Sequence, residues 1–238
     1  MLPCVILAGG LATRLYPVTR DVPKALVEVA GEPFVRHQLR LLQRNGISRV
    51  VICVGHLGQL IRVALDQSPE AGLDVNVVSD GPTLLGTAGA IRAAIPLLGS
   101  AFFVMYGDSY LPCDFSRVQS AFMRAHKKAL MTVFCNDGHW DISNVEFANG
   151  QIIAYDKRNP TERMRHIDYG LGVFSSTAFD SVSAAAPADL ATLYRHLLDE
   201  QEVAGYEVTE RFYEIGSFDG LQETRELLGS TGATRRPT

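Results

Sequence analysis

The sequence ILAGGLATRLYPVTRDVPKAL, which runs from Ile6 to Leu26, indicates the fold more strongly than any other segment of the chain. It opens with a short apolar strand, and two adjacent glycines, Gly9 and Gly10, follow directly. Glycines let backbone N–H groups approach a phosphate closely. The guanidinium of Arg14 and the ammonium of Lys24 would then neutralise phosphate charge. The segment therefore predicts a triphosphate site at the carboxyl end of the first strand, where open α/β sheets bind ligands.

Length and composition exclude several other classes of protein. The chain has 238 residues, enough to bury an ample core, and its net charge of −4 gives no basic field for nucleic acid. No signal peptide is expected, and the most membrane-like stretch, residues 88–107, is interrupted by Arg92 and Pro96. No C-x-x-C pair occurs among the four cysteines, Cys4, Cys53, Cys113 and Cys135. Three of these cysteines adjoin apolar runs, which favours buried free thiols in a cytoplasmic protein.

Apolar runs alternate with helix-period segments through the first half of the chain. The expected strands are Cys4–Ala8, Val50–Val54, Val75–Ser79, Phe102–Tyr106 and Leu130–Phe134. The expected helices are Phe34–Asn45, Gly58–Asp66, Thr87–Leu98 and Phe115–Lys127. Strands that are apolar on both faces and alternate with helices predict an α/β fold with a mixed, mostly parallel sheet covered on both sides.

The pattern changes after residue 136. Two short strands, Val145–Phe147 and Ile152–Tyr155, flank the turn at residues 148–150 and predict a hairpin. The remaining expected elements are the strands Tyr169–Phe174 and Phe212–Ile215 and the helices Thr177–Ala185, Leu190–Glu202 and Asp219–Leu228. No linker divides the chain, so we expect a single domain over residues 1–229 and a disordered tail over residues 230–238.

The opening segment resembles the N-terminal signature of the sugar-1-phosphate nucleotidylyltransferases, G-x-G-T-R-L followed by P and PK. The glycines, the Thr13-Arg14-Leu15 triplet and the Pro23-Lys24 pair occur in that order. Ala12 replaces the second glycine of the family pattern, and it would be strained by about 1 kcal/mol if the position required a positive φ. The chain contains neither the dinucleotide fingerprint G-x-G-x-x-G nor a Walker A motif.

This resemblance implies a single Rossmann-like α/β/α sandwich. Residues 1 to about 135 would hold the nucleotide, and residues 136–229 would hold the sugar phosphate. The implied enzyme joins a sugar 1-phosphate to a nucleoside triphosphate and releases pyrophosphate, by in-line attack that needs no general base. The short chain looks most like the bacterial heptose-1-phosphate guanylyltransferases and N-acetylmuramate-1-phosphate uridylyltransferases. The sugar stays open, and the base also stays open, with GTP favoured.

A second glycine segment, Leu85–Gly89, follows a strand and opens a helix, where backbone N–H groups are free donors. In the family, a similar segment packs against the nucleobase, although Gly-Thr before a helix is also an ordinary capping arrangement. The resemblance and this segment together give the expected nucleotide-binding residues: Leu7, Ala8, Gly9, Gly10, Thr13, Arg14, Gly86, Thr87, Ala88 and Gly107.

Two acidic residues are expected to hold Mg²⁺. Asp108 ends a strongly apolar strand after Tyr106 and Gly107, and it resembles the family aspartate that ligates Mg²⁺ between the phosphates. Glu214 stands where the family has a second aspartate, and its extra methylene shifts the carboxylate by more than about 1 Å. We expect Asp219, five residues later, to cap the last helix instead. Arg14, Lys24 and Asp108 are the expected catalytic residues.

The resemblance also predicts a sugar-phosphate side. Asp156-Lys157 is similar to the E-K pair of the family, and Asp168-Tyr169-Gly170 stands where relatives carry N-A-G. The expected ligands are Lys24, Asp156, Lys157, Asp168 and Gly170. A solvated hairpin end for Asp156-Lys157, and a local structural hydrogen bond for Asp168, are the alternatives.

Two other functions remain open from the sequence. One is a cytidylyltransferase for a phosphorylated alcohol such as phosphocholine. The other is an inactive regulatory subunit that binds nucleotide sugars, and Ala12 and Glu214 motivate it. The sequence is compatible with a homo-oligomer but does not specify one.

Overall fold

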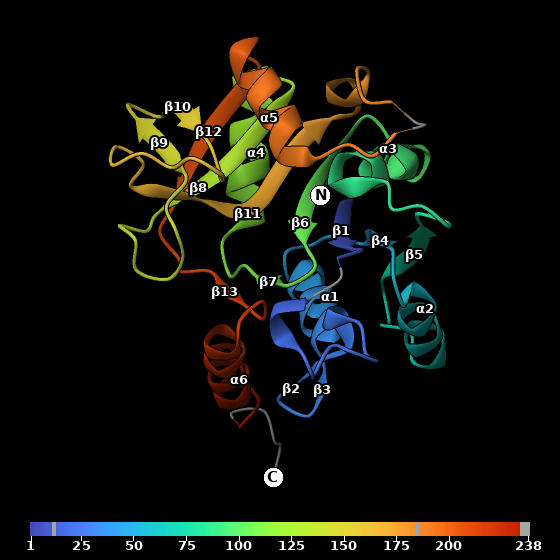
Figure 1. Ribbon diagram of the computed structural model, residues 1–238. Coiled ribbons are helices and arrows are strands. Elements are labelled where there is room, and N and C mark those ends of the chain that lie inside the picture. Colours follow the sequence, from blue (N-terminus) through green and yellow to red (C-terminus); the bar gives the residue numbers. More distant parts are fainter. Residues whose placement is uncertain (11–12, 184–185, 234–238) are drawn as a thin grey trace.

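The computed structural model describes residues 1–10, 13–183 and 186–233 of the chain. Figure 1 shows a twisted central sheet with helices on both of its faces. The described strands are β1 Cys4–Ala8, β2 Glu28–Val29, β3 Glu32–Pro33, β4 Arg49–Val54, β5 Asp74–Ser79, β6 Ala101–Tyr106, β7 Ser109–Tyr110, β8 Ala129–Cys135, β9 Val145–Ala148, β10 Gln151–Tyr155, β11 His166–Ser175, β12 Val203–Val208 and β13 Tyr213–Glu214. The described helices are α1 Phe34–Arg44, α2 Gly58–Gln67, α3 Gly86–Leu98, α4 Phe115–Ala125, α5 Leu190–Asp199 and α6 Phe218–Ala233, with 3₁₀ turns at Thr13–Leu15, Lys24–Leu26 and Ser176–Phe179.

The central sheet runs in the order β10-β9-β11-β6-β1-β4-β5, and β8 and β12 join it through β11. Strands β6, β1, β4 and β5 are mutually parallel, and β12 is parallel to β8. Strand β11 pairs antiparallel with β6, β8 and β9, so the sheet is mixed. The predicted α/β fold with a mixed, mostly parallel sheet is confirmed.

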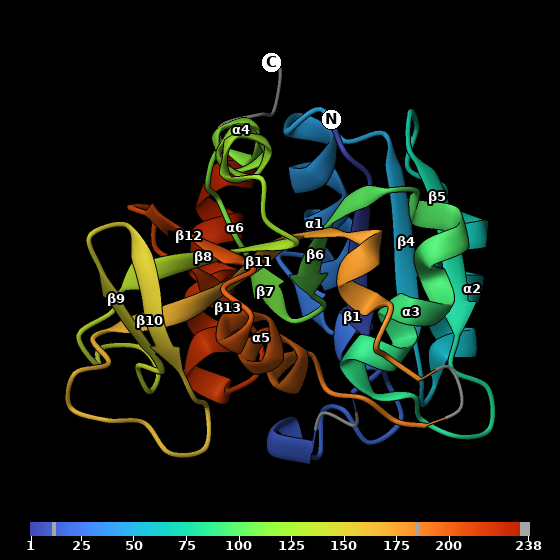
Figure 2. The same ribbon diagram turned by 90° about the horizontal axis from the view of Figure 1, so that it is seen from above.

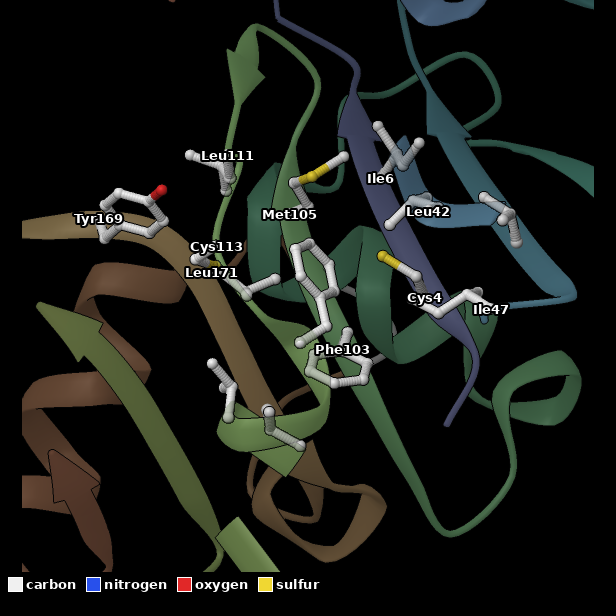
Figure 3. Packing of buried hydrophobic residues seen from close by; sticks show 14 of the residues in the cluster. Cys4, Ile6, Leu42, Ile47, Phe103, Met105, Leu111, Cys113, Tyr169 and Leu171 are labelled. Carbon is white, nitrogen blue, oxygen red and sulfur yellow. The ribbon is translucent and has the colours of Figure 1, made fainter. Parts of the chain in front are cut away.

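Successive side chains of β1 point to opposite faces of the sheet, so the core lies in two parts. Cys4 and Ile6 belong to one buried cluster, which α1, α2 and α4 cover. Val5 belongs to a second cluster on the other face, which α3 and α5 cover. Figure 2 shows the layers from above, and Figure 3 shows Ile6, Phe103 and other side chains of the first cluster packed together. Burial of each such side chain stabilises the fold by about 1.5–3 kcal/mol.

A third, smaller cluster joins the two ends of the chain. Val29 and Phe34 near the start pack against Leu221 and Leu228 of α6. The Arg225 guanidinium also donates hydrogen bonds to the backbone oxygen of Glu28, at 3.3 and 3.1 Å. In Figure 1, α6 accordingly lies beside β2 and β3. This packing brings the segment before α6 next to the segment that carries Lys24.

Several local expectations are confirmed. The hairpin turns at Asn149 and Gly150, with φ of +52° and +76°, as two-residue hairpin loops require. Three cysteines, Cys4, Cys53 and Cys113, are buried free thiols, whereas Cys135 is exposed. None of the described helices is both long and apolar enough to cross a lipid bilayer.

Two expectations for the second half are wrong. Instead of a helix over Thr177–Ala185, the structure has a 3₁₀ turn at Ser176–Phe179, and residues 184–185 lie outside the described residues. The helix expected over Leu190–Glu202 ends at Asp199, and the unpredicted strand β12 follows it. Its sequence, VAGYEV, has no continuous apolar run, because Gly205 interrupts it. A glycine is needed there, since a Cβ at position 205 would lie 2.6 Å from the Phe147 ring.

The last helix also differs from its prediction. Helix α6 begins at Phe218 and extends to Ala233, beyond the predicted end at Leu228, so residues 230–233 are helical. Asp219 is not its cap, because the Ser217 hydroxyl accepts the Gly220 N–H at 3.0 Å, and Asp219 lies in the first helical turn. The predicted strand Phe212–Ile215 is reduced to β13. Ala12 and the end of the predicted tail, residues 234–238, lie outside the described residues.

Candidate active site

A cavity of about 320 Å³ opens at the carboxyl ends of the parallel strands. The chain leaves β1, β4, β5 and β6 at the same edge of the sheet, and residues at or after the end of each strand face the cavity. The lining residues are Leu7, Ala8, Gly9, Gly10, Lys24, Ala25, Cys53, Asp80, Leu84, Gly86, Thr87, Ala90, Tyr106, Gly107 and Asp108. Seven of the ten predicted nucleotide-binding residues are among them.

Glycines let three strand ends approach one another at this cavity. A Cβ added at Gly55, after β4, would lie 2.8 Å from the backbone oxygen of Gly9. A Cβ added at Gly107 would lie 2.7 Å from the backbone oxygen of Leu7, which accepts the Gly107 N–H at 2.9 Å. Both contacts are shorter than real Cβ atoms allow. Side chains at these positions would therefore push the glycine loop away from β4 and β6.

Lys24 and Asp108 meet at the cavity. The Lys24 Nζ atom lies 3.0 Å from Asp108 Oδ2, and the side chains are 16% and 31% exposed. Lys24 begins a 3₁₀ turn after Pro23, while Asp108 follows the buried strand β6. The pair combines an ammonium with a carboxylate, and both groups keep contact with solvent. Such a pair can bind a phosphate and a metal ion side by side.

Glu214 and Arg14 extend this charged centre. Strand β13 pairs with β7, and the Ile215 N–H donates to the Asp108 backbone oxygen at 2.9 Å. A Cβ added at Gly216 would lie 2.5 Å from Glu214 Oε2, 3.2 Å from Arg14 Nη2 and 3.4 Å from Lys24 Nζ. These three charged groups therefore gather around a single point. Arg14 is itself exposed and does not line the cavity.

A buried glutamine that the sequence analysis missed holds the loop of Asp108. Gln38 lies on α1 and is fully buried. Its Nε2 donates to the backbone oxygens of Tyr106 and Ser109, at 3.0 and 2.8 Å. The two hydrogen bonds fix the backbone on both sides of Asp108. A polar residue on the apolar face of a predicted helix was the available signal.

A second cavity, of about 190 Å³, adjoins the first across Thr87 and Tyr106, which line both. Its other lining residues are Tyr155, Asp156, Lys157, Arg158, Asp189, Ala191 and Arg195. Asp189 and Arg195 belong to the start and the middle of α5, and the sequence analysis did not single them out. Their signal was weak, since charged residues on an amphipathic helix usually face solvent.

Lys157 is held in place beside the second cavity. Its Nζ lies 3.1 Å from Asp168 Oδ2, 3.4 Å from the Tyr106 hydroxyl and 4.8 Å from the centre of the Tyr106 ring. Burial alone would lower the pKa of Lys157, but the charge of Asp168 and these contacts outweigh it and raise that pKa. Burial, with the Asp168 charge, raises the pKa of Tyr106 to about 12. Lys157 is therefore a fixed cation across the neutral pH range.

The other predicted sugar-side residues have structural partners. Asp168 is 3% exposed and lines neither cavity, and it accepts hydrogen bonds from the Tyr155 hydroxyl and the Gly170 N–H, at 3.2 and 3.1 Å. Gly170 has a φ of +95° and lies against Tyr106. Asp156 lines the cavity, but its Oδ1 accepts the N–H groups of the next turn at 2.7 and 3.1 Å, which lower its pKa. These contacts support the alternative interpretation that Asp168 forms local structural hydrogen bonds.

The start of α3 differs from its prediction. The Ala88 N–H is not a free donor, because it donates to the Ala188 backbone oxygen at 2.9 Å. Ala88 is fully buried and does not line the cavity, whereas Gly86 and Thr87 do. The Thr87 hydroxyl donates to Asp189 at 3.1 Å and accepts the Leu190 N–H at 2.7 Å. The loop before α5 therefore accepts hydrogen bonds from Thr87 and Ala88, which were predicted to be free for a nucleotide. Thr13 begins a 3₁₀ turn, and its side chain lies outside the described part of the structure.

The carboxylates present fit a hard divalent cation. Asp108 reaches the cavity, and its contacts with Lys24 and Ser109 leave acceptor capacity on both oxygens. Glu214 accepts the Ser217 hydroxyl at 2.5 Å and the Gly216 N–H, so it also supports the start of α6. Mg²⁺ typically takes one or two protein carboxylates and fills its other positions with phosphate and water. Asp108 suits that role directly, and Glu214 can add to it.

Comparison with known proteins identifies the class. A family model described as nucleotidyl transferase matches residues 4–141, which is more than half of the 238 residues. The chain therefore belongs to the nucleotidyl transferase family. This confirms the family and the enzyme class that the opening segment predicts. Enzymes of this family commonly use a divalent metal ion.

Two characterised relatives indicate the range of the family. The chain is 29% identical over 233 residues to the N-acetylmuramate alpha-1-phosphate uridylyltransferase of Neisseria meningitidis serogroup B, covering 95% of this chain and 98% of the relative. It is 26% identical over 220 residues to the mannose-1-phosphate guanylyltransferase catalytic subunit beta of Xenopus tropicalis. That match covers 89% of this chain but 60% of the frog protein.

Solved structures confirm the fold. HddC from Yersinia pseudotuberculosis superposes with a TM-score of 0.81 at 20% identity, covering 96% of this chain and all of that one. A putative glucose-1-phosphate thymidylyltransferase from Bacillus anthracis gives 0.82 at 20% identity, covering 96% of each chain. At this level of identity, the similarity shows the fold alone.

Proposed function

We propose that the protein joins a sugar 1-phosphate to a nucleoside triphosphate and releases pyrophosphate. One observation carries this proposal: the glycine loop, Lys24 and Asp108 line one cavity that adjoins the cavity beside Lys157. The first would hold the triphosphate and the second the sugar phosphate. Both characterised relatives named above are sugar-1-phosphate nucleotidyltransferases, which supports the assignment.

The reaction needs alignment and charge neutralisation more than acid–base chemistry. An oxygen of the sugar phosphate, already an anion, forms a bond to the α-phosphorus as the bond to the β-phosphate oxygen breaks. Gly9 and Gly10 would cradle the triphosphate through backbone N–H groups. Arg14 would neutralise charge on the departing pyrophosphate, and Lys24 would hold the reacting phosphates in line.

Asp108 and Glu214 are the proposed Mg²⁺ ligands, and the bound ion would neutralise phosphate oxygens. On the other side, Lys157 would hold the phosphate of the sugar, with Asp168 fixing its ammonium from beneath. Thr87, Asp189 and Arg195 offer hydrogen-bonding groups for the sugar itself. We place the reaction in the cytoplasm, where the free thiols of the chain would stay reduced.

A pyrophosphate-release screen tests this function. The purified protein is incubated with Mg²⁺, each of five nucleoside triphosphates and hexose, heptose, amino-sugar or choline phosphates. Pyrophosphate that forms only with a sugar 1-phosphate is the expected result, and chelation of the metal should abolish it. Pyrophosphate formed from CTP and phosphocholine alone would show a cytidylyltransferase instead.

The inactive regulatory subunit predicts a different outcome. It would bind nucleotide sugars but release no pyrophosphate with any pair of substrates. The paired Lys24 and Asp108 side chains, both open to solvent, favour an active enzyme over that alternative. Isothermal titration with nucleotide sugars, run beside the screen, separates the two.

A further inference from the structure

Asp80 occupies the end of the nucleotide cavity farthest from Asp108. It follows β5 directly, and its N–H donates to the Val54 backbone oxygen at 3.0 Å. Strands β6, β1, β4 and β5 lie in this order, so Asp108 and Asp80 follow strands three spacings apart, about 14 Å. Both residues line the same cavity. A ligand with phosphates at Asp108 would therefore have its opposite end at Asp80.

The Asp80 carboxylate is only partly satisfied. Its Oδ2 accepts the Leu85 N–H at 3.1 Å, while Oδ1 accepts no hydrogen bond from the described part of the chain. No cationic side chain among residues 1–10, 13–183 and 186–233 forms an ion pair with it. Neighbouring lining residues, Cys53, Leu84 and Ala90, are apolar. Burial raises the pKa of Asp80, although the Leu85 N–H opposes this. Hydrogen-bond donors from a ligand in the cavity would complete the contacts of this partly buried carboxylate.

The chemistry of the nucleobases selects among ligands. A phosphate would be repelled by Asp80, so the phosphates belong at Gly9, Gly10 and Lys24 and the base belongs at Asp80. An ionised carboxylate can only accept hydrogen bonds. Guanine presents two neighbouring N–H donors on its pairing edge, N1–H and the N2 amino group. Uracil and thymine present one N–H between two carbonyl oxygens, and adenine and cytosine present an amino group beside a ring nitrogen lone pair.

We propose that Asp80 recognises the pairing edge of guanine and that the nucleotide substrate is GTP. This inference rests on the proposed function, and it fixes the base, which the uridylyl- and guanylyl-transferases among the relatives leave open. Two charge-assisted hydrogen bonds would favour guanine, and every other base would place an oxygen or a lone pair against the carboxylate. A site that hydrogen-bonds its substrate rejects analogues that lack the donor.

The experiment compares GTP with its analogues on wild-type protein and Asp80→Asn. ITP lacks the N2 amino group, and kcat/KM should fall at least tenfold from GTP to ITP. Asp80→Asn should lose most of this difference and lower kcat/KM for GTP at least tenfold. It should gain activity with XTP, because an amide matches the N–H and carbonyl of xanthine. Asp74→Asn, at the other end of β5, is the matched control and should behave as wild type.

Direct binding separates this inference from the proposed function. Equilibrium dialysis with GTP, ITP and UTP measures base preference without turnover, and GTP should bind at least tenfold more tightly than the others. Turnover that prefers UTP or CTP would overturn the role of Asp80 and leave nucleotidyl transfer standing. An unchanged ratio of GTP to ITP in Asp80→Asn would also overturn it. Tight GTP binding without pyrophosphate release would support Asp80 and refute the proposed function.

Discussion

The ammonium of Lys24 lies 3.0 Å from the carboxylate of Asp108, across 84 positions of sequence. Lys24 begins a 3₁₀ turn directly after Pro23, and Asp108 comes shortly after the buried strand β6. The pair places opposite charges at one point of the cavity. Because both side chains are partly exposed, the pair contributes little to stability, within the 0–1 kcal/mol typical of surface ion pairs. We expect the pair to act instead in binding the phosphates and the metal ion of the substrate complex.

Removal of the Lys24 charge should reduce turnover without unfolding the protein. Lys24→Met is expected to lower kcat/KM about 10²–10³-fold, because it removes a cation that would act on the phosphates. Asp108→Ala and Arg14→Ala should cause losses of similar size. Lys127→Met, at an exposed lysine, is the control. Pyrophosphate release gives the rates, and thermal unfolding checks the fold. Near-normal rates in Lys24→Met would refute its role.

Gly216→Ala should disturb the charged centre by steric contact alone. The added methyl group would lie 2.5 Å from Glu214 Oε2 and within 3.4 Å of the Arg14 and Lys24 nitrogens. We expect at least a tenfold loss of kcat/KM, about 1.4 kcal/mol of barrier. Gly229→Ala, in α6 with nothing within 4 Å of the added group, should leave activity unchanged. Equal activity of the two variants would contradict the convergence of these groups.

Gln38→Leu should loosen the loop that carries Asp108. It removes two hydrogen bonds to backbone oxygens, and the free energy of unfolding should fall by about 1–3 kcal/mol. A positioning role further predicts a lower kcat with little change in KM for the nucleotide. Gln43→Leu on the same helix, where the side chain is exposed, is the matched control. Urea unfolding and steady-state kinetics make the two measurements. A loss of stability with unchanged kcat would leave Gln38 a purely structural residue.

The pH dependence of sugar-phosphate binding should report on Lys157. Its pKa is raised in the folded protein, so the ammonium persists above the usual value of about 10.4. Its contribution to stability is therefore complete below that pH and is lost only as the pH rises through the folded pKa. KM for the sugar phosphate should stay flat between pH 7 and pH 10. In Asp168→Asn, burial would dominate and lower the Lys157 pKa, so KM should rise within that range. Asp199→Asn is the control, and a flat profile in Asp168→Asn would contradict the coupling.

Two substitutions separate the metal and structural roles of Glu214. Glu214→Gln should raise the Mg²⁺ concentration for half-maximal activity at least tenfold, because it removes a charged ligand. Ser217→Ala removes the hydroxyl that binds Glu214 and caps α6, and it should cost about 1 kcal/mol of stability. Its Mg²⁺ requirement should stay near that of wild type. Metal titrations and thermal unfolding distinguish these outcomes. The same Mg²⁺ requirement in Glu214→Gln and wild type would exclude Glu214 as a ligand.

Local sequence patterns predict the elements of the first half of the chain better than those of the second half. The strand β1 matches its prediction, and most other strands and helices of the first half differ by a residue or two at their ends. Strand β12 was missed because VAGYEV lacks periodicity and depends on β8 for its partner. Asp219 was predicted to cap the last helix, but α6 begins at Phe218, so Ser217 directly precedes the helix and Asp219 lies inside its first turn.

The sequence by itself determined the α/β architecture, the glycine loop and the acidic residue after β6, because these depend on short windows of periodicity and turn chemistry. The tertiary structure decided which distant residues meet: Lys24 with Asp108, Lys157 with Asp168, and Gln38 with the loop after β6. It also placed Asp80 on the same cavity as Asp108, and it buried Asp168 away from that cavity. These contacts depend on the order of strands in the sheet and on the packing of helices across it, which no local pattern of residues encodes.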